Sequence, residues 1–122
     1  MTVARRRLAW RRGRRAEGLA AWWLRLKGYR LVARNYRSGA GEIDLIACRG
    51  SILAMVEVKT RDDLSSASEA LGGRQRARIA RAAEAFLQQR PALARLSVRF
   101  DVILVAPGRF PRHLMDAWRP DL

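Results

Sequence analysis

Residues 41–61 form two β-like runs around a short turn, and their charged side chains fall at every second position. The turn is Arg49-Gly50-Ser51. Side chains on a strand alternate between its faces, so one face of the pair is apolar, with Ile43, Leu45, Ala47, Ala54, Val56 and Val58. The other face carries Glu42, Asp44, Ile46, Met55, Glu57 and Lys59. The segment therefore predicts a hairpin that brings carboxylates and a lysine together within the most hydrophobic part of the chain.

Two neighbouring carboxylates repel one another unless a cation lies between them. Asp44 and Glu57, completed by a backbone carbonyl and water, suit Mg²⁺ or Mn²⁺. Lys59 points to the same side and could orient water or stabilise negative charge on a phosphate. The alternative is a solvated strand face, which is the commoner meaning of a Glu-x-Lys pattern. The pattern alone leaves both interpretations open.

Further segments match those of a known family. The spacing of Asp44, Glu57 and Lys59 resembles the motif of the PD-(D/E)xK nucleases. Together with Glu17-Gly18-Leu19-Ala20, Arg34-Asn35-Tyr36-Arg37 and Arg99-Phe100-Asp101-Val102, it resembles the YraN family of small bacterial proteins. The match extends from about residue 17 to residue 105. It implies a single restriction-endonuclease-like α/β domain with an αβββαβ core, a mixed sheet flanked by helices, similar to archaeal Holliday-junction resolvases.

The resemblance also implies roles for individual residues. Asp44, Glu57 and the backbone carbonyl of Val58 would bind the metal, and Lys59 would act on the attacking water. Glu17 would complete the site, although by itself a glutamate early in a helix is explained equally well by the helix dipole. Gln75 lies one turn before Ile79 on the apolar face of the helix expected over residues 74–90, so it should point inward. The family tends to have Lys where this chain has Arg74, which leaves the role of Arg74 open.

The charge of the chain is extreme for its size. The net charge is +14, and all but two of its 25 basic residues are arginine, which pairs well with phosphate. Seven arginines and no acid lie in residues 1–15, which we interpret as a basic arm, flexible or a frayed helix start, preceding a nuclease-like domain over residues 16–122. A tail without a specific role is the alternative. The candidate nucleic-acid contacts are Arg11, Arg12, Arg37, Arg61, Arg74, Arg78 and Arg81.

Other function classes are disfavoured. The chain has no apolar run long enough to cross a membrane and no secretory signal at its N-terminus. Its single cysteine, Cys48, fits a reducing compartment, so we expect a cytoplasmic bacterial protein that could associate with the nucleoid. The single histidine, His113, disfavours a zinc site or a Ser-His-Asp triad.

The remaining elements follow from periodicity and from Gly and Pro positions. We expect helices over residues 16–27 and 74–90, strands over 29–36, 41–48, 52–61 and 98–105, and an edge strand near 114–118. Residues 62–73 should form a loop that overhangs the site. Asp101, on the last core strand, should orient an arginine or support the metal site.

The residues are compatible with two functions from different classes. The first is a divalent-metal-dependent nuclease acting on DNA, in particular branched or damaged DNA. The alternative is a non-catalytic nucleic-acid-binding module that retains the nuclease fold. A homodimer is a further expectation, because exposed tryptophans such as Trp22 offer apolar contact area.

Overall fold

The computed structural model describes residues 3–39, 41–60 and 72–120. Its helices are α1 (Val3–Leu26) and α3 (Gly73–Gln89), with a short 3₁₀ turn, η1 (Pro91–Leu93), after α3. Its strands are β1 (Arg30–Ser38), β2 (Gly41–Arg49), β3 (Ile52–Thr60), β4 (Ser97–Val105) and β5 (Arg112–Trp118). The αβββαβ order is as predicted, and the expected edge strand is present as β5.

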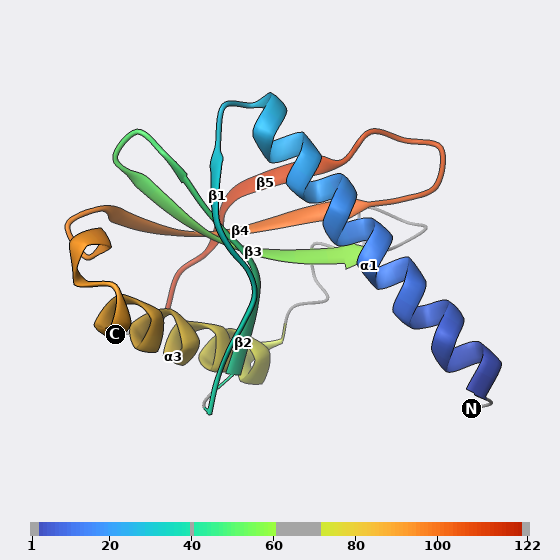
Figure 1. Ribbon diagram of the computed structural model, residues 1–122, viewed down its shortest axis with the longest axis horizontal. Helices are drawn as coiled ribbons and strands as arrows, with labels where there is room; N and C mark the ends of the chain where they lie inside the picture. The colour runs from blue at the N-terminus through green and yellow to red at the C-terminus, as the bar shows by residue number, and fades with distance from the viewer. Residues whose placement is uncertain (1–2, 40, 61–71, 121–122) are drawn as a thin grey trace.

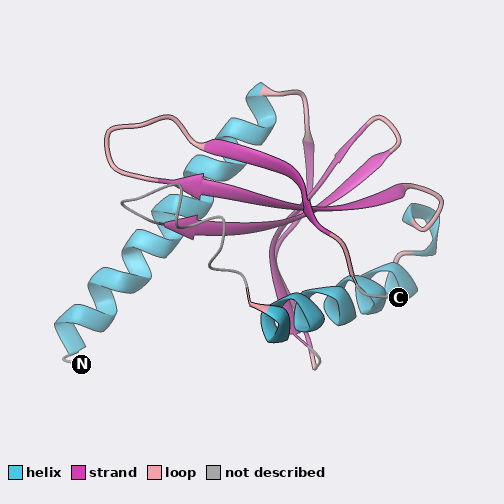
Figure 2. Cartoon of the chain, turned by 180° about the vertical axis from the view of Figure 1, so that it is seen from behind, coloured by secondary structure: helices cyan, strands magenta, loops and turns pink. Residues whose placement is uncertain are grey.

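The five strands form one sheet in the order β1-β2-β3-β4-β5. Successive neighbours are antiparallel except β3 and β4, which run parallel and are joined through α3. A parallel pair needs such a crossover, and here the crossover helix covers one face of the sheet. Helix α1 covers the other face, as the two opposite views show (Figures 1 and 2). The fold is therefore α/β, a mixed sheet between two helices.

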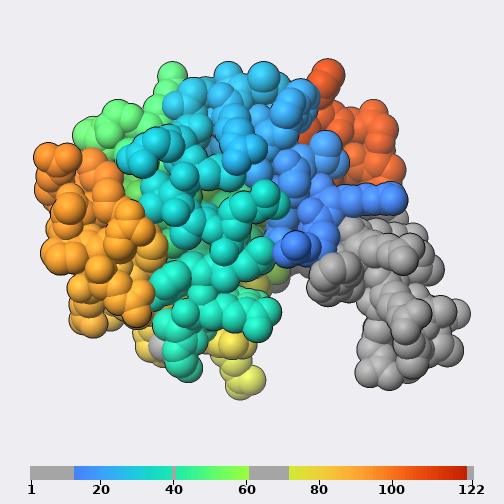
Figure 3. All heavy atoms as spheres, in the orientation of Figure 1, coloured from blue at the N-terminus to red at the C-terminus, as the bar shows by residue number. Residues whose placement is uncertain are grey.

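Each helix packs on its own core. Against α3, Ile79 and Phe86 contact Ile46, Met55 and Leu104 of the sheet. Against α1, Leu24 and three alanines pack on Leu45, Val56 and Ile103. The small alanine side chains, Ala16, Ala20 and Ala21, let α1 lie close to the strands. In the space-filling view the atoms of α1 lie directly against those of β1 (Figure 3). Burial of Leu24 alone is worth about 1.5–3 kcal/mol.

Helix α1 begins earlier than the sequence predicted. We expected it to start at residue 16, after a basic arm that was either flexible or a frayed helix start, but the helix is continuous from Val3 to Leu26. Gly28 follows it, with a φ of 88° that is the left-handed geometry of a helix stop. Arginine, alanine and leucine are all good helix formers, which explains the extension. The N-terminal end projects beyond the sheet in Figure 1. Neither described helix has an apolar stretch long enough to cross a membrane.

One predicted face assignment is wrong. Ile43 was expected to share a face with Leu45 and Ala47, but it packs in the core beneath α3 while those two pack beneath α1. The alternation breaks in residues 41–44, the part of β2 that precedes Leu45 and is not paired with β3. At that point β2 continues with β1 alone, and its course is no longer fixed by both neighbours.

A buried polar network ties the C-terminal strands to the end of α1. Asp101 is fully buried and accepts hydrogen bonds from Arg99 (2.9 and 2.8 Å), from His113 Nε2 (2.7 Å) and from the N–H of Asp116 (3.0 Å). Lys27 Nζ lies 2.6 Å from His113 Nδ1. An ammonium can only donate, so Nδ1 accepts and Nε2 carries the proton given to Asp101. Asp101 therefore orients an arginine, one of its two predicted roles.

Candidate active site

The sheet opens between β2 and β3. Their pairing runs from Arg49 opposite Ile52 to Leu45 opposite Val56 and stops there. Beyond this point β2 stays paired with β1 and β3 stays paired with β4, so the two strands separate. Figure 1 shows β2 turning downward while β3 continues sideways. Extending the register would place Asp44 opposite Glu57, at the start of the opening.

Asp44 bridges the opening with its side chain. Its Oδ2 accepts a hydrogen bond of 2.8 Å from the main-chain N–H of Val58. In a continuous sheet, a main-chain carbonyl on the neighbouring strand would take that proton. The carboxylate does so here, and the bond fixes its position beside the backbone of β3.

Gln75, near the start of α3, connects the two other predicted site residues. Its Nε2 donates to Glu57 Oε1 at 3.3 Å, and its Oε1 accepts from Lys59 Nζ at 3.2 Å. An amide is suited to this position because it has one donor group and one acceptor. The structure thus brings Asp44, Glu57, Lys59 and Gln75 together, with Gln75 pointing inward as expected.

The electrostatics of Glu57 show that this site favours positive charge. Burial, followed by the charge of Asp44 and a hydrogen bond with Asp44, raises the pKa of Glu57 to about 9, against the lowering effect of Lys59. A carboxyl group that holds its proton at neutral pH lacks a cation to compensate its charge. The charged form of Glu57 is therefore destabilised at this site.

Glu17 lies on the other side of Asp44, on α1. Burial raises its pKa, and the charge of Asp44 adds to the shift, while Asn35 lowers it. With the amide oriented so that both groups are satisfied, Asn35 Nδ2 donates to the two carboxylate oxygens of Glu17 at 2.9 and 3.3 Å. The expected site residue from α1 is thus close enough to Asp44 for their charges to interact.

Asn35 is a site residue that the sequence patterns did not predict. Arg34 pairs with Leu45 and Tyr36 with Ile43, so Asn35 lies opposite Asp44 on β1. Its φ is 51°, a left-handed conformation that asparagine tolerates better than other non-glycine residues. An asparagine in the middle of a predicted strand is the signal that could have identified it, because asparagine is depleted there.

The predicted phosphate-binding arginines that the structure describes lie on α3 and on β1. Arg74, Arg78 and Arg81 are exposed along α3, the helix that carries Gln75. Arg37 is exposed at the far end of β1 and pairs with Glu42 at 3.2 Å. Arg61, the side chains of Arg11 and Arg12, and most of the loop expected over residues 62–73 lie outside the described residues.

The donor groups fit a hard divalent cation only in part. Among the residues whose side chains are described, no three His, Cys, Asp or Glu side chains are grouped closely enough to hold an ion by themselves. Asp44 and Glu57 supply two carboxylates, and backbone carbonyls and water often complete the shell of Mg²⁺. Because burial and the charge of Asp44 raise the pKa of Glu57, a cation at this position would stabilise its charged form. The site can hold an ion that keeps several waters.

Comparison with known proteins places this chain among close relatives. The sequence model described as "Uncharacterised protein family UPF0102" matches residues 16–105. A UPF0102 protein of Paramagnetospirillum magneticum is 59% identical over 117 residues, 93% of this chain and 91% of the relative. One of Parvibaculum lavamentivorans is 56% identical, covering 92% and 84%, and one of Maricaulis maris is 50% identical, covering 98% and 94%.

Proposed function

This chain belongs to the uncharacterised protein family UPF0102, and we propose that it is a divalent-metal-dependent nuclease acting on branched or damaged DNA. The proposal includes the finer resemblance, to restriction-endonuclease-like proteins and Holliday-junction resolvases. The single observation that carries it is the hydrogen-bonded set of Glu57, Gln75 and Lys59 beside Asp44, where β2 and β3 separate.

The acids provide the place for the metal. Asp44 and Glu57 would hold Mg²⁺ or Mn²⁺ together with the carbonyl of Val58. Once bound, the ion would neutralise charge on the phosphate and activate a water. Asp44 is held in position by the N–H of Val58, and Glu57 by the amide of Gln75. Glu17 and Asn35 add a third carboxyl group and its partner on the α1 side.

Lys59 carries the proposed chemical role. Its ammonium group, oriented by Gln75, would stabilise the negative charge that builds up on the phosphate as water attacks. The water oxygen forms the new P–O bond, the sugar oxygen leaves, and a water proton ends on the leaving oxygen. Gln75 would contact a phosphate oxygen through its NH₂ group, which also donates to Glu57, because its carbonyl oxygen accepts from Lys59 and cannot pair with another acceptor.

The basic surface supports a nucleic-acid substrate. A net charge of +14 attracts polyanions, and the exposed arginines of α3 flank the residue that reaches the site. We place the protein in the bacterial cytoplasm, associated with the nucleoid, as part of this proposal. Such binding is expected to depend steeply on salt.

A non-catalytic binding module is the second candidate. The observation that favours it is the lack of a grouped set of three metal-ligand side chains among those described. Such a module would keep the fold and the arginines but would hydrolyse nothing. Lys59 would have no chemical role in such a module.

The deciding experiment is a cleavage assay on labelled four-way junctions, flaps, nicked duplexes and linear duplexes, with Mg²⁺ or Mn²⁺ titrated. Wild-type protein should cut at least one branched or nicked substrate, and EDTA should stop it. Binding of the same DNAs should weaken by roughly a thousandfold between about 50 and 200 mM salt if about six phosphates are contacted. Salt-sensitive binding without cleavage of any substrate would favour the binding module.

A further inference from the structure

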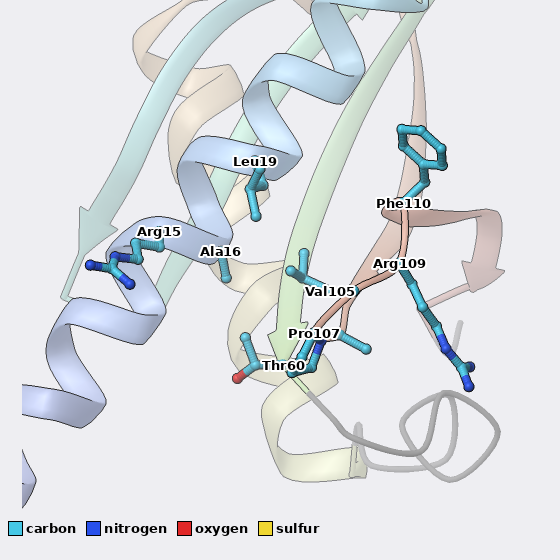
Figure 4. A pocket seen from close by; sticks show the side chains of 10 residues that line it. Arg15, Ala16, Leu19, Thr60, Val105, Pro107, Arg109 and Phe110 are labelled. Atoms are coloured by element: carbon cyan, nitrogen blue, oxygen red, sulfur yellow. The ribbon is translucent and has the colours of Figure 1, made fainter.

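A groove lies beside the candidate site, on the α1 face. It has a volume of about 1000 Å³ and lies between α1 and the loop that joins β4 to β5. Its walls include Arg15 and Leu19 of α1, Thr60 at the end of β3, and Val105, Arg109 and Phe110 (Figure 4). The cleavage chemistry proposed above uses none of these side chains.

The groove and the candidate site are adjacent at two places along the chain. Thr60 directly follows Lys59 on β3, and Ala16, also in the wall, directly precedes Glu17 on α1. Consecutive residues on a strand point to opposite faces, so β3 separates the groove from Lys59 by the thickness of one strand. A strand of nucleic acid that leaves the site past the end of β3 would enter this groove.

The groove combines exposed aromatic and cationic side chains. Phe110 is 73% exposed and stacks on Trp23, with ring centroids 5.7 Å apart and planes at 30°. Trp22, 45% exposed, lies next to Trp23 at 6.1 Å. Arg15 and Arg109 are exposed at the edges of the groove, where their side chains extend outward (Figure 4). None of the described residues lining the groove is acidic.

The aromatic and cationic side chains of the groove favour some classes of ligand over others. Aromatic faces stack on bases that are free of a duplex, and arginine binds the connecting phosphates, whereas an intact duplex presents its backbone and keeps its bases stacked inside. A second copy of this chain meeting the same surface about a two-fold axis would bring arginine-bearing walls together, with no acid among the described lining residues to pair them. The lining therefore favours an unpaired strand.

We propose that this groove binds unpaired nucleotides of a nucleic-acid strand, with a base on Phe110 and phosphates on Arg15 and Arg109. Combined with the proposed nuclease activity, on which this part rests, it makes the substrate a junction between duplex and single strand. A flap or splayed end is then preferred over a blunt duplex.

The test measures binding without metal, so it does not depend on cleavage. Fluorescence anisotropy in EDTA compares a labelled oligo-dT of about twelve nucleotides with a blunt two-stranded duplex. Phe110→Ala should weaken oligo-dT binding about five- to a hundredfold, the value of one stacked base, and leave duplex binding unchanged. Phe110→Trp should retain the affinity, and Arg109→Ala should also weaken oligo-dT binding.

Matched controls lie away from the groove. Met115→Ala removes an exposed apolar side chain from β5, and Arg95→Ala removes an exposed arginine before β4; neither should change oligo-dT binding. Equal effects of Phe110→Ala and Met115→Ala on oligo-dT binding, or equal losses of affinity for oligo-dT and for the blunt duplex, would overturn the proposal. So would a dimer in sedimentation that Phe110→Ala converts to monomer without changing oligo-dT affinity, because the groove would then be an interface between copies.

The two proposals fail in different assays. If wild-type protein cuts no substrate but Phe110→Ala selectively loses oligo-dT binding, the proposal of strand binding in the groove is supported and the proposal of nuclease activity is contradicted. If junctions are cut but Phe110→Ala leaves oligo-dT binding unchanged, the proposal of nuclease activity is supported and the proposal of strand binding in the groove is contradicted.

Discussion

The carboxylate of Asp44 accepts the main-chain N–H of Val58 at 2.8 Å, at the point where their strands part. A side chain thus substitutes for a main-chain acceptor and holds an acid against the strand that carries Glu57 and Lys59. The bond also ties the position of Asp44 to the backbone of β3 rather than to the rotamer preferences of an exposed aspartate. Its consequence is a fixed distance between the two halves of the candidate site.

Replacing Lys59 separates chemistry from binding. Lys59→Ala should reduce cleavage by roughly 10²–10³, because a charge-stabilising group acts mainly in the transition state. Affinity for the same DNA should remain nearly intact, since one cation among many contributes little to the bound ground state. Single-turnover cleavage and anisotropy measure the two effects. A parallel loss of both would assign Lys59 to binding alone.

The raised pKa of Glu57 predicts a pH dependence of stability. The unfolded chain releases this proton near 4.5, whereas the folded protein holds it to about 9, so the stability of the metal-free protein should fall as pH rises between those values. Glu57→Gln should remove this contribution to the pH dependence of stability, measured as the change of melting temperature with pH. Mn²⁺ should stabilise the wild type more at high pH and lose that effect in the variant.

Glu84→Gln provides the control for that series. Glu84 is exposed on α3, and its replacement should leave the slope and the Mn²⁺ effect unchanged. Identical slopes in wild type and Glu57→Gln would mean that Glu57 titrates in the folded protein as it does in the unfolded chain.

Gly41 should tolerate no side chain. A Cβ there would lie 2.5 Å from the carbonyl oxygen of Arg78 on α3, a backbone contact that cannot move alone. Gly41→Ala should lower the free energy of unfolding by about 1–3 kcal/mol, as overpacking does. It should also displace α3 and with it Gln75. Gly39→Ala, where the added atom meets nothing within 4 Å, is the matched control in urea denaturation.

Asp101 should be a major determinant of stability. Burial raises the pKa of Asp101, but hydrogen bonds from His113 and Arg99 outweigh that effect, so the pKa lies below its ordinary value of 3.8. Its contribution is therefore present above that value and lost as pH falls through the folded pKa. Asp101→Asn should cost about 3 kcal/mol at neutral pH, because the largely buried guanidinium of Arg99 loses its charge partner.

The difference in the free energy of unfolding between wild type and Asp101→Asn should become smaller as the pH falls. Asp116→Asn, at an exposed side chain whose φ of 52° asparagine tolerates, should cost little. Equal unfolding free energies for Asp101→Asn and wild type at neutral pH would contradict the role of the network.

Much of the fold could be predicted from local patterns. The hairpin over residues 41–61 and the inward position of Gln75 depend on periods of two and of 3.6, which sequence spacing records directly. The face of Ile43 could not be predicted this way, because it depends on β2 losing one of its two neighbours. Asn35 was missed for a similar reason, since its partner Glu17 comes from a distant helix. The start of α1 at Val3 was only one of two alternatives, because a run of arginines is compatible both with a flexible arm and with a helix start.

The separation of β2 and β3 also bears on the order of folding events. Asp44 and Glu57 meet through a local hairpin, which closes in about 1–10 μs, whereas Gln75 arrives with the slower crossover that pairs β3 with β4. The repulsion between the acids is thus present before the amide that steadies Glu57. Changes at the acids should act on the folding rate, and changes at Gln75 on the unfolding rate. The candidate site would then be complete only after the last helix has docked.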